Sequence, residues 1–223
     1  WGFKSDGLYQ TEEELAMAPK TPYKDAQVGD IRYIDINGDG WLNEDDRVEV
    51  GRSTTPEMMF AFSGDMNWKG LDFSVQFQGA ALCDKFLLHA WGNGAEDANP
   101  LTRPWYGGWD NAPLFLVENS WRPDNPNAAF PRLSTSPISN NSLASDYWKK
   151  NGAYLRLKNV TLGYTLPKKW TKKALIENLR LYVSGNNLLT FTEFKYLDPE
   201  SPNVINGYYP QQRTFVFGVD VTF

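Results

Sequence analysis

Residues 58–78 read MMFAFSGDMNWKGLDFSVQFQ, and this stretch decides the fold class. Apolar residues take alternate positions from Met58 to Met66 and again from Leu71 to Phe77, on either side of residues 67–70. Such alternation is typical of half-buried β-strands, and the short polar break between the two runs is typical of a hairpin turn. The stretch therefore predicts an antiparallel hairpin with one apolar face.

Three later stretches repeat the pattern. In residues 154–166 the leucines stand at odd positions up to Leu157, and the apolar residues stand at even positions from Val160. A one-residue β-bulge near Lys158 and Asn159 would bring both sets to the same face. Pro167 ends that strand, residues 168–176 can form a short helical turn, and residues 179–185 alternate again. The last run places five apolar residues on one face: Phe215, Phe217, Val219, Val221 and Phe223. Together with the hairpin, these stretches predict five strands of about ten residues each.

Composition excludes several classes of function. The 22 Lys and Arg residues are outnumbered by 27 Asp and Glu, and the net charge of −5 is spread along the chain, so a nucleic-acid partner is not expected. With one Cys and one His, the chain has no internal disulfide, zinc set or Ser-His-Asp triad. Nine Trp, 18 Gly and 14 Pro favour strands and long structured loops, and residues 11–16 give the one helical signal. The chain begins at Trp1, so we expect it to be a piece of a longer protein.

The strand pattern fits either half of a soluble β-sandwich or an arc of a membrane β-barrel, because both need alternating faces. Three features favour the barrel. The polar faces of the hairpin carry Ser, Asn, Gln and Asp rather than Lys and Glu, and short links alternate with long loops. Aromatic residues also stand near strand ends, as in membrane girdles: Trp68, Tyr164, Trp170, Phe191 and Phe223.

Several strings resemble one family. Residues 154–167 (YLRLKNVTLGYTLP), residues 179–190 (LRLYVSGNNLLT), Asp198-Pro199-Glu200 and the terminal aromatic strand resemble the C-terminal end of the SusC/RagA-type TonB-linked outer-membrane transporters of Bacteroidetes. The resemblance extends from about residue 29 through residues 55–79 and 121–133 to Phe223, and it is weak over residues 1–28 and 80–120.

The resemblance implies an all-β fold, with the chain supplying about five strands of a large plugged antiparallel transmembrane β-barrel of about 22 strands. It implies an outer-membrane importer of oligosaccharides or peptides that works with a SusD-like lipoprotein, with TonB through a part not present in this chain, and with lipid around the barrel. The alternative is a calcium-stabilised surface β-sandwich that binds glycans without transport. Neither reading is enzymatic, since no pair of carboxylates is placed on a pocket.

The expected organisation follows from these assignments. Residues 1–54 form an extracellular loop region, residues 55–79 a transmembrane hairpin, residues 80–147 a long extracellular loop, and residues 148–223 three barrel strands ending in an assembly signal. By resemblance, the residues of this signal are those on the apolar face of the last strand. They are Phe215, Phe217, Val219, Val221 and Phe223.

Residues 35–46 read DINGDGWLNEDD and match an EF-hand loop. Oxygen-bearing side chains stand at loop positions 1, 3, 5, 9 and 12, with Gly40 at the sharp turn. The expected calcium ligands are Asp35, Asn37, Asp39, the carbonyl of Trp41, Asn43 and Asp46. Because strands rather than helices flank the loop, a structural ion is expected rather than a sensor. The alternative is a turn rich in Asp and Asn without metal.

A second candidate site is an aromatic loop. Flat rings beside amides and carboxylates suit sugar faces or a partner protein, and they equally suit a loop that packs on itself. The residues concerned are Trp91, Asn93, Trp105, Tyr106, Trp109 and Asp110.

Overall fold

The computed structural model describes residues 1–223 except 24–25, 88–113, 135–137, 196 and 202–210. The described residues form two compact units. Unit 1 holds those of Trp1–Arg52, Asp84–Lys150 and Ser201–Tyr208, and unit 2 holds those of Ser53–Cys83, Asn151–Glu200 and Tyr209–Phe223. No helix in the described ranges is long and apolar enough to cross a membrane.

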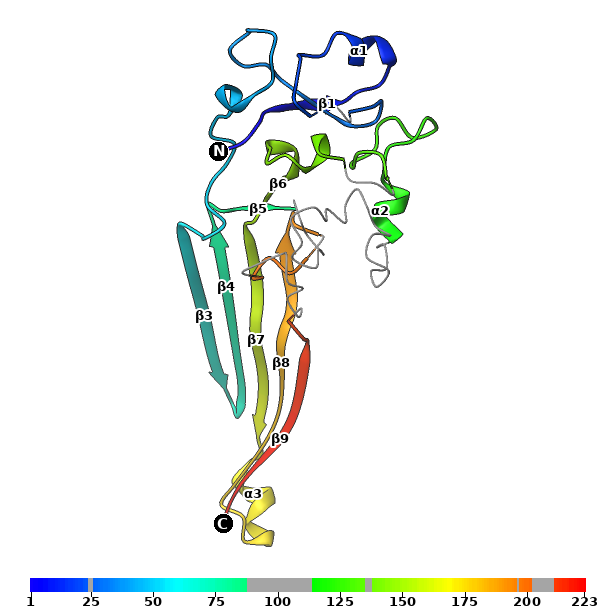
Figure 1. The fold of residues 1–223 in the computed structure, drawn as a ribbon. Helices are drawn as coiled ribbons and strands as arrows, with labels where there is room; N and C mark the ends of the chain where they lie inside the picture. Colours follow the sequence, from blue (N-terminus) through cyan, green and yellow to red (C-terminus); the bar gives the residue numbers. More distant parts are fainter. Residues whose placement is uncertain (24–25, 88–113, 135–137, 196, 202–210) are drawn as a thin grey trace. The chain divides into compact units, whose positions relative to one another are not determined.

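Unit 2 is built on a five-stranded antiparallel sheet whose strands lie side by side in chain order (Figure 1). The strands are β3 (Met58–Trp68), β4 (Leu71–Ala81), β7 (Tyr154–Thr165), β8 (Asn178–Thr192) and β9 (Thr214–Thr222). One end of the sheet carries the turn between β3 and β4, the helical turns α3 (Lys168–Thr171) and η4 (Lys172–Ala174), and the C-terminus. The long links, 82–153 and 193–213, leave from the other end, which confirms the expected alternation of short and long connections.

The turn of the hairpin has two residues, Lys69 and Gly70, with φ of 48° and 86°. Two consecutive positive φ values are typical of the type I′ turn, whose twist matches that of the flanking strands. A Cβ on Gly70 would lie 2.7 Å from the carbonyl oxygen of Thr165, so the position requires glycine on steric grounds as well.

The expected bulge is confirmed at Lys158. Gln76 pairs with Asn159 and Phe77 with Leu157, so Lys158 is the extra residue between two partners of β4. The slip of one residue restores the phase of the apolar positions, because the side chains of a strand alternate strictly. Leu157 and Val160 therefore point to the same face although their spacing is odd.

The register makes both faces continuous across all five strands. Directly opposed residues lie on one face of a sheet, so each row can be followed from strand to strand. One apolar row is Met66, Phe73, Leu162, Val183 and Phe217. A polar row, three residues away along β3, is Ser63, Gln76, Asn159, Asn186 and Thr214. We call these surfaces the apolar face and the polar face.

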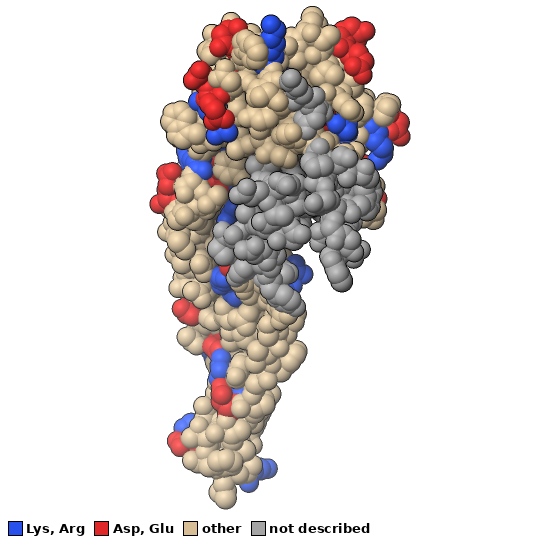
Figure 2. Space-filling view, viewed as in Figure 1, with Lys and Arg blue, Asp and Glu red and all other residues tan. Residues whose placement is uncertain are grey.

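Large side chains on the apolar face are exposed. Phe62 is 53% and Phe217 is 82% accessible, and the ring of Phe62 stacks on that of Phe77 with centroids 4.8 Å apart. The space-filling view shows few charged side chains along the sheet, some of them in one contiguous group, whereas they are frequent over unit 1 (Figure 2). Within unit 2, the described residues supply no second sheet that would bury this surface.

Unit 1 contains short elements and extended segments. In chain order they are β1 (Ser5–Leu8), α1 (Glu12–Ala16), β2 (Ile31–Tyr33), η1 (Glu44–Asp46), β5 (Asp84–Phe86), α2 (Leu114–Glu118), η2 (Asn140–Ser142), η3 (Asp146–Trp148) and β6 (Lys149–Asn151). β1 pairs with β2, and β5 pairs with β6. Helix α1 confirms the helical signal, since the hydroxyl of Thr11 accepts a hydrogen bond from the amide of Glu14.

A buried ion pair ties distant segments of unit 1 together. Asp30 is fully buried, and its carboxylate lies 2.8 Å from Nε of Arg132. It also accepts hydrogen bonds from the amide of Gln27 and the side chain of Asn141. Burial raises the pKa of Asp30, and Arg132 opposes that effect. The carboxylate can remain charged inside the unit because every side of it meets a donor.

Candidate functional sites: a calcium-type loop and the polar face of the sheet

The loop of residues 35–46 is ordered by its own side chains. Asp35 accepts hydrogen bonds from the amides of Gly38 and Gly40, each at 2.7 Å. Asn37 accepts one from the amide of Asp39, and Asp39 accepts one from the amide of Trp41. Gly40 has φ of 82°, which accounts for glycine at the sharp turn.

Asp46 closes the loop from its far end. Its carboxylate is fully buried and accepts hydrogen bonds from the amides of Ile36, Asn37 and Asn43. Burial alone would raise the pKa of Asp46, but these backbone donors hold it below its usual value. One carboxylate therefore joins the last residue of the loop to the amides of Ile36 and Asn37 near its start.

The donor set has the chemistry that calcium prefers. Five side chains offer oxygens to amides of one loop. Oδ1 of Asp46 accepts from two amides, whereas the acceptor oxygens of the other four side chains each keep a further lone pair. No group of three His, Cys, Asp or Glu residues converges in the described part of the chain, because the carboxylates of this loop are turned to its amides. The six expected ligands thus lie in one loop, as the sequence indicates, and calcium remains a prediction.

The polar face carries an ion-pair cluster near the end of the sheet with short turns. Arg180 on β8 makes a bidentate contact with Asp72 on β4, at 2.6 and 2.9 Å. Its remaining nitrogen lies 2.9 Å from Asp220 on β9. A planar guanidinium suits this geometry, since it presents donors in a fixed fork. The cluster links strands whose residues are far apart in sequence.

A second cluster lies at the other end of the polar face. Arg156 on β7 is 2% accessible and contacts Asp198 at 2.7 Å, while Lys158 contacts Glu200 at 3.0 Å. Asp198 also accepts hydrogen bonds from the amides of Glu200 and Gln211. The segment after β8 is therefore anchored on the polar face of unit 2.

The sequence did not reveal these ion pairs. The available signal was a charged residue at an inward position of a strand, as at Arg156 and Arg180, which requires a partner in a low-dielectric setting. The acidic residue that pairs with each arginine depends on the strand register and on the path of the chain after β8. Neither follows from the local sequence pattern.

The remaining expected site residues fall in two groups. The aromatic loop residues Trp91, Asn93, Trp105, Tyr106, Trp109 and Asp110 lie outside the described residues. In β9, Phe215, Phe217, Val219 and Val221 alternate on the apolar face, and Phe223 follows directly with 85% of its surface accessible. Asp220 lies on the polar face, as expected from the alternation.

Comparisons with known proteins identify relatives along the whole chain. No family model matches. TonB-dependent receptor P26 of Formosa agariphila is 32% identical over 100% of this chain and 22% of its own length. TonB-dependent receptor SusC of Bacteroides thetaiotaomicron is 26% identical over 86% of this chain and 17% of its own length. The chain therefore spans about a fifth of the length of these relatives.

The fold is shared with a solved transporter. The structure described as the RagAB peptide transporter aligns with 100% of this chain and 22% of its own, with a TM-score of 0.64 and 24% identity. Relatives named as receptors agree with the expectation that the chain is not an enzyme. The two-faced antiparallel sheet, the fold match and the relatives that align with 86–100% of this chain lead to one assignment. The chain is a barrel segment of a SusC/RagA-type TonB-dependent outer-membrane receptor.

Proposed function

We propose that this chain forms part of the wall of an outer-membrane importer for oligosaccharides or peptides. In this proposal the apolar face meets lipid and the polar face lines the lumen. The end of the sheet with the long links faces the outside, and the end with the two-residue turn and α3 faces the periplasm. Unit 1 then belongs to the extracellular part of the receptor.

The observation that carries the proposal is the continuity of the two faces over five strands. Each strand of the hairpin has 11 residues, which at about 3.4 Å per residue and a tilt of about 40° cover roughly 29 Å. This matches an apolar band about 25 Å tall. A glycan-binding sandwich is not favoured, because it would bury the apolar face against a second sheet.

The partners in this proposal come from the relatives. Their names include TonB-dependent receptors and a peptide transporter, so TonB is the expected source of energy and peptides are one expected cargo. Oligosaccharides are the other cargo that the sequence resemblance implies. A SusD-like lipoprotein is the proposed partner at the outer surface. The aromatic loop with Trp91 and Trp105 is proposed as the contact for cargo or for this partner.

Uptake by cells tests the proposal. Cells that lack the full-length receptor should lose uptake of one fluorescent cargo class, either oligosaccharide or peptide, and a plasmid copy should restore it. Cells that lack TonB should fail in the same assay, since the proposed import is energised. Uptake of both cargo classes at the normal rate without the receptor would contradict the proposal.

We also propose calcium as a structural ion in residues 35–46. Replacing Asp35 and Asp39 together by Ala should abolish a stoichiometric calcium signal in metal analysis of the purified receptor, because two carboxylates of the site are lost. The matched control is Asp124→Ala in the same unit, whose carboxylate is exposed and pairs with Arg122. An equal calcium content in all three proteins would exclude the site.

A further inference from the structure

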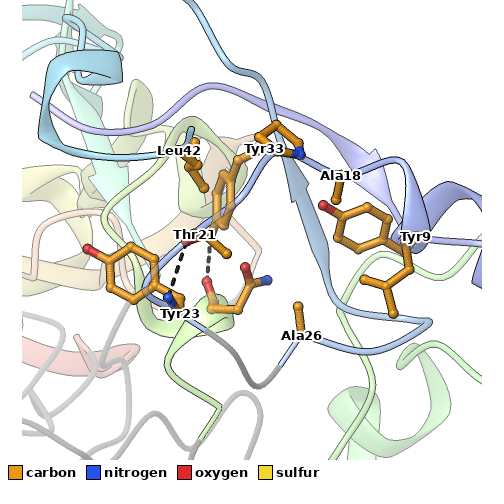
Figure 3. Close-up of a pocket in the computed structure, with 10 residues that line it drawn as sticks. Tyr9, Ala18, Thr21, Tyr23, Ala26, Tyr33 and Leu42 are labelled. Carbon is orange, nitrogen blue, oxygen red and sulfur yellow. Dashed lines mark hydrogen bonds between the residues drawn. The ribbon is translucent and has the colours of Figure 1, made fainter. Parts of the chain in front are cut away.

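A cavity of about 160 Å³ lies in unit 1 beside the calcium-type loop (Figure 3). Three tyrosines, Tyr9, Tyr23 and Tyr33, contribute to its wall, and Leu42 enters from the calcium-type loop. Tyr9, Tyr33 and Leu42 are buried, whereas Tyr23 is half-buried, so one side of the cavity is reached from solvent. A cavity of about 150 Å³ with apolar walls holds one benzene ring.

The hydroxyl of Tyr9 points toward the middle of this cavity (Figure 3). The side chain of Tyr9 is 5% accessible, and within the described part of the chain its hydroxyl makes no hydrogen bond. The hydroxyl of Tyr33 differs, since it donates to the carbonyl of Asn140 at 2.9 Å. Burial raises the pKa of Tyr9, so the group stays protonated and keeps its donor. The hydroxyl therefore opens onto the cavity, where an occupant that carries an acceptor can bind to it.

The position of Tyr9 is fixed before anything binds. Its amide donates to the carbonyl of Asp30, and its carbonyl accepts from the amide of Gly29. On the opposite side, the amide of Lys20 donates to the carbonyl of Gly40. The amide of Leu42 donates in turn to the carbonyl of Lys20. The walls are thus held by backbone contacts, which reduces the ordering cost of binding.

We propose that this cavity binds one phenol ring carried by a polypeptide, with the ring between the tyrosines and aliphatic walls and its oxygen facing the hydroxyl of Tyr9. A sugar ring fits less well, because its several hydroxyls would each need a partner. The amide nitrogen of Asn140 already donates to the carbonyl of Ile31. Aromatic and aliphatic residues predominate in the lining, and polar groups reach its surface beside them, which suits an aromatic ring with a polar tip.

A neighbouring hollow argues for a polypeptide as the carrier of the ring. It has a volume of about 320 Å³ and shares Tyr9, Ala18, Pro19 and Tyr33 with the first cavity. Its rim includes Arg32, which lies 2.9 Å from Asp6. A chain that places its ring in the first cavity can therefore lay its backbone along the second.

The test is a binding titration on the full-length receptor in amphipol, followed by saturation-transfer NMR with N-acetyltyrosine amide. We expect saturable binding that Ala18→Leu and Ala26→Leu each weaken at least tenfold, because the added carbons fill the cavity. Tyr9→Phe should weaken the tyrosine amide about two- to tenfold and leave N-acetylphenylalanine amide within about twofold, since it removes one neutral hydrogen bond. Tyr147→Phe, which removes a hydroxyl elsewhere in unit 1, should change neither affinity.

Three results would overturn the proposal. Saturable binding that persists at wild-type affinity in both Ala18→Leu and Ala26→Leu would place the ring elsewhere. Equal losses for the two amides in Tyr9→Phe would remove the role of its hydroxyl. Tighter binding of methyl glucoside than of the tyrosine amide would make this a sugar site. None of these results depends on uptake, so they are separable from a failure of the import proposal.

Discussion

The assignment of the two faces can be tested by moving one charge across the sheet. Val75 on β4 lies opposite Gly64 and Val160, in the middle of the apolar face. Its neighbour Ser74 lies opposite Asp65 and Thr161 on the polar face. Val75→Arg and Ser74→Arg therefore place the same charge at nearly the same height on opposite sides of one strand.

The expected difference follows from the medium on each side. An arginine on the lipid face near the bilayer midplane costs about 2–4 kcal/mol, which lowers the equilibrium constant for folding by about 30- to 900-fold. On the polar face the charge stays hydrated and stands opposite the carboxylate of Asp65. We expect Ser74→Arg to change the free energy of unfolding by about 1 kcal/mol or less.

The assay is urea unfolding of the full-length receptor in lipid vesicles, followed by the heat-modifiable band on gels. The Val75 variant should unfold at clearly lower urea, whereas the Ser74 variant should overlap with the wild type. A larger loss for Ser74→Arg than for Val75→Arg would refute the assignment and place lipid on the other face. Equal losses would refute the idea that the faces meet different media.

Further predictions concern unit 1 and the last strand. Arg132→Met should cost about 3–5 kcal/mol of stability, because it leaves Asp30 charged and buried without its cation, and adding Asp30→Asn should recover much of that loss in denaturant titrations. The Asp46 carboxylate should contribute its full share to the stability of the loop above its ordinary pKa of about 3.9. That contribution should be lost as pH falls through the lower pKa of the folded state, and hydrogen exchange of the loop amides can follow the loss. Deleting Phe223 should reduce receptor yield in outer-membrane fractions more than Thr222→Ser, and equal yields would remove the assembly-signal hypothesis.

Local pattern determined much of the sheet. The alternation in residues 58–78 predicts the hairpin, because a strand turns successive side chains to opposite faces and the polar residues between the runs favour a turn. The phase change around Lys158 predicts the bulge for the same reason. The loop of residues 35–46 was also recognisable, since its Asp and Asn side chains bond to amides two to five residues away.

Tertiary structure decided what local pattern could not express. The pairing of Arg180 with Asp72 and of Arg132 with Asp30 joins residues more than one hundred positions apart, and many acids along the chain could have served each arginine equally well. The cavity beside Tyr9 needs walls from α1, β2, η2 and the calcium-type loop at once. Alternation tells which face a residue takes, but it carries no information about which distant segment will come to lie against that face.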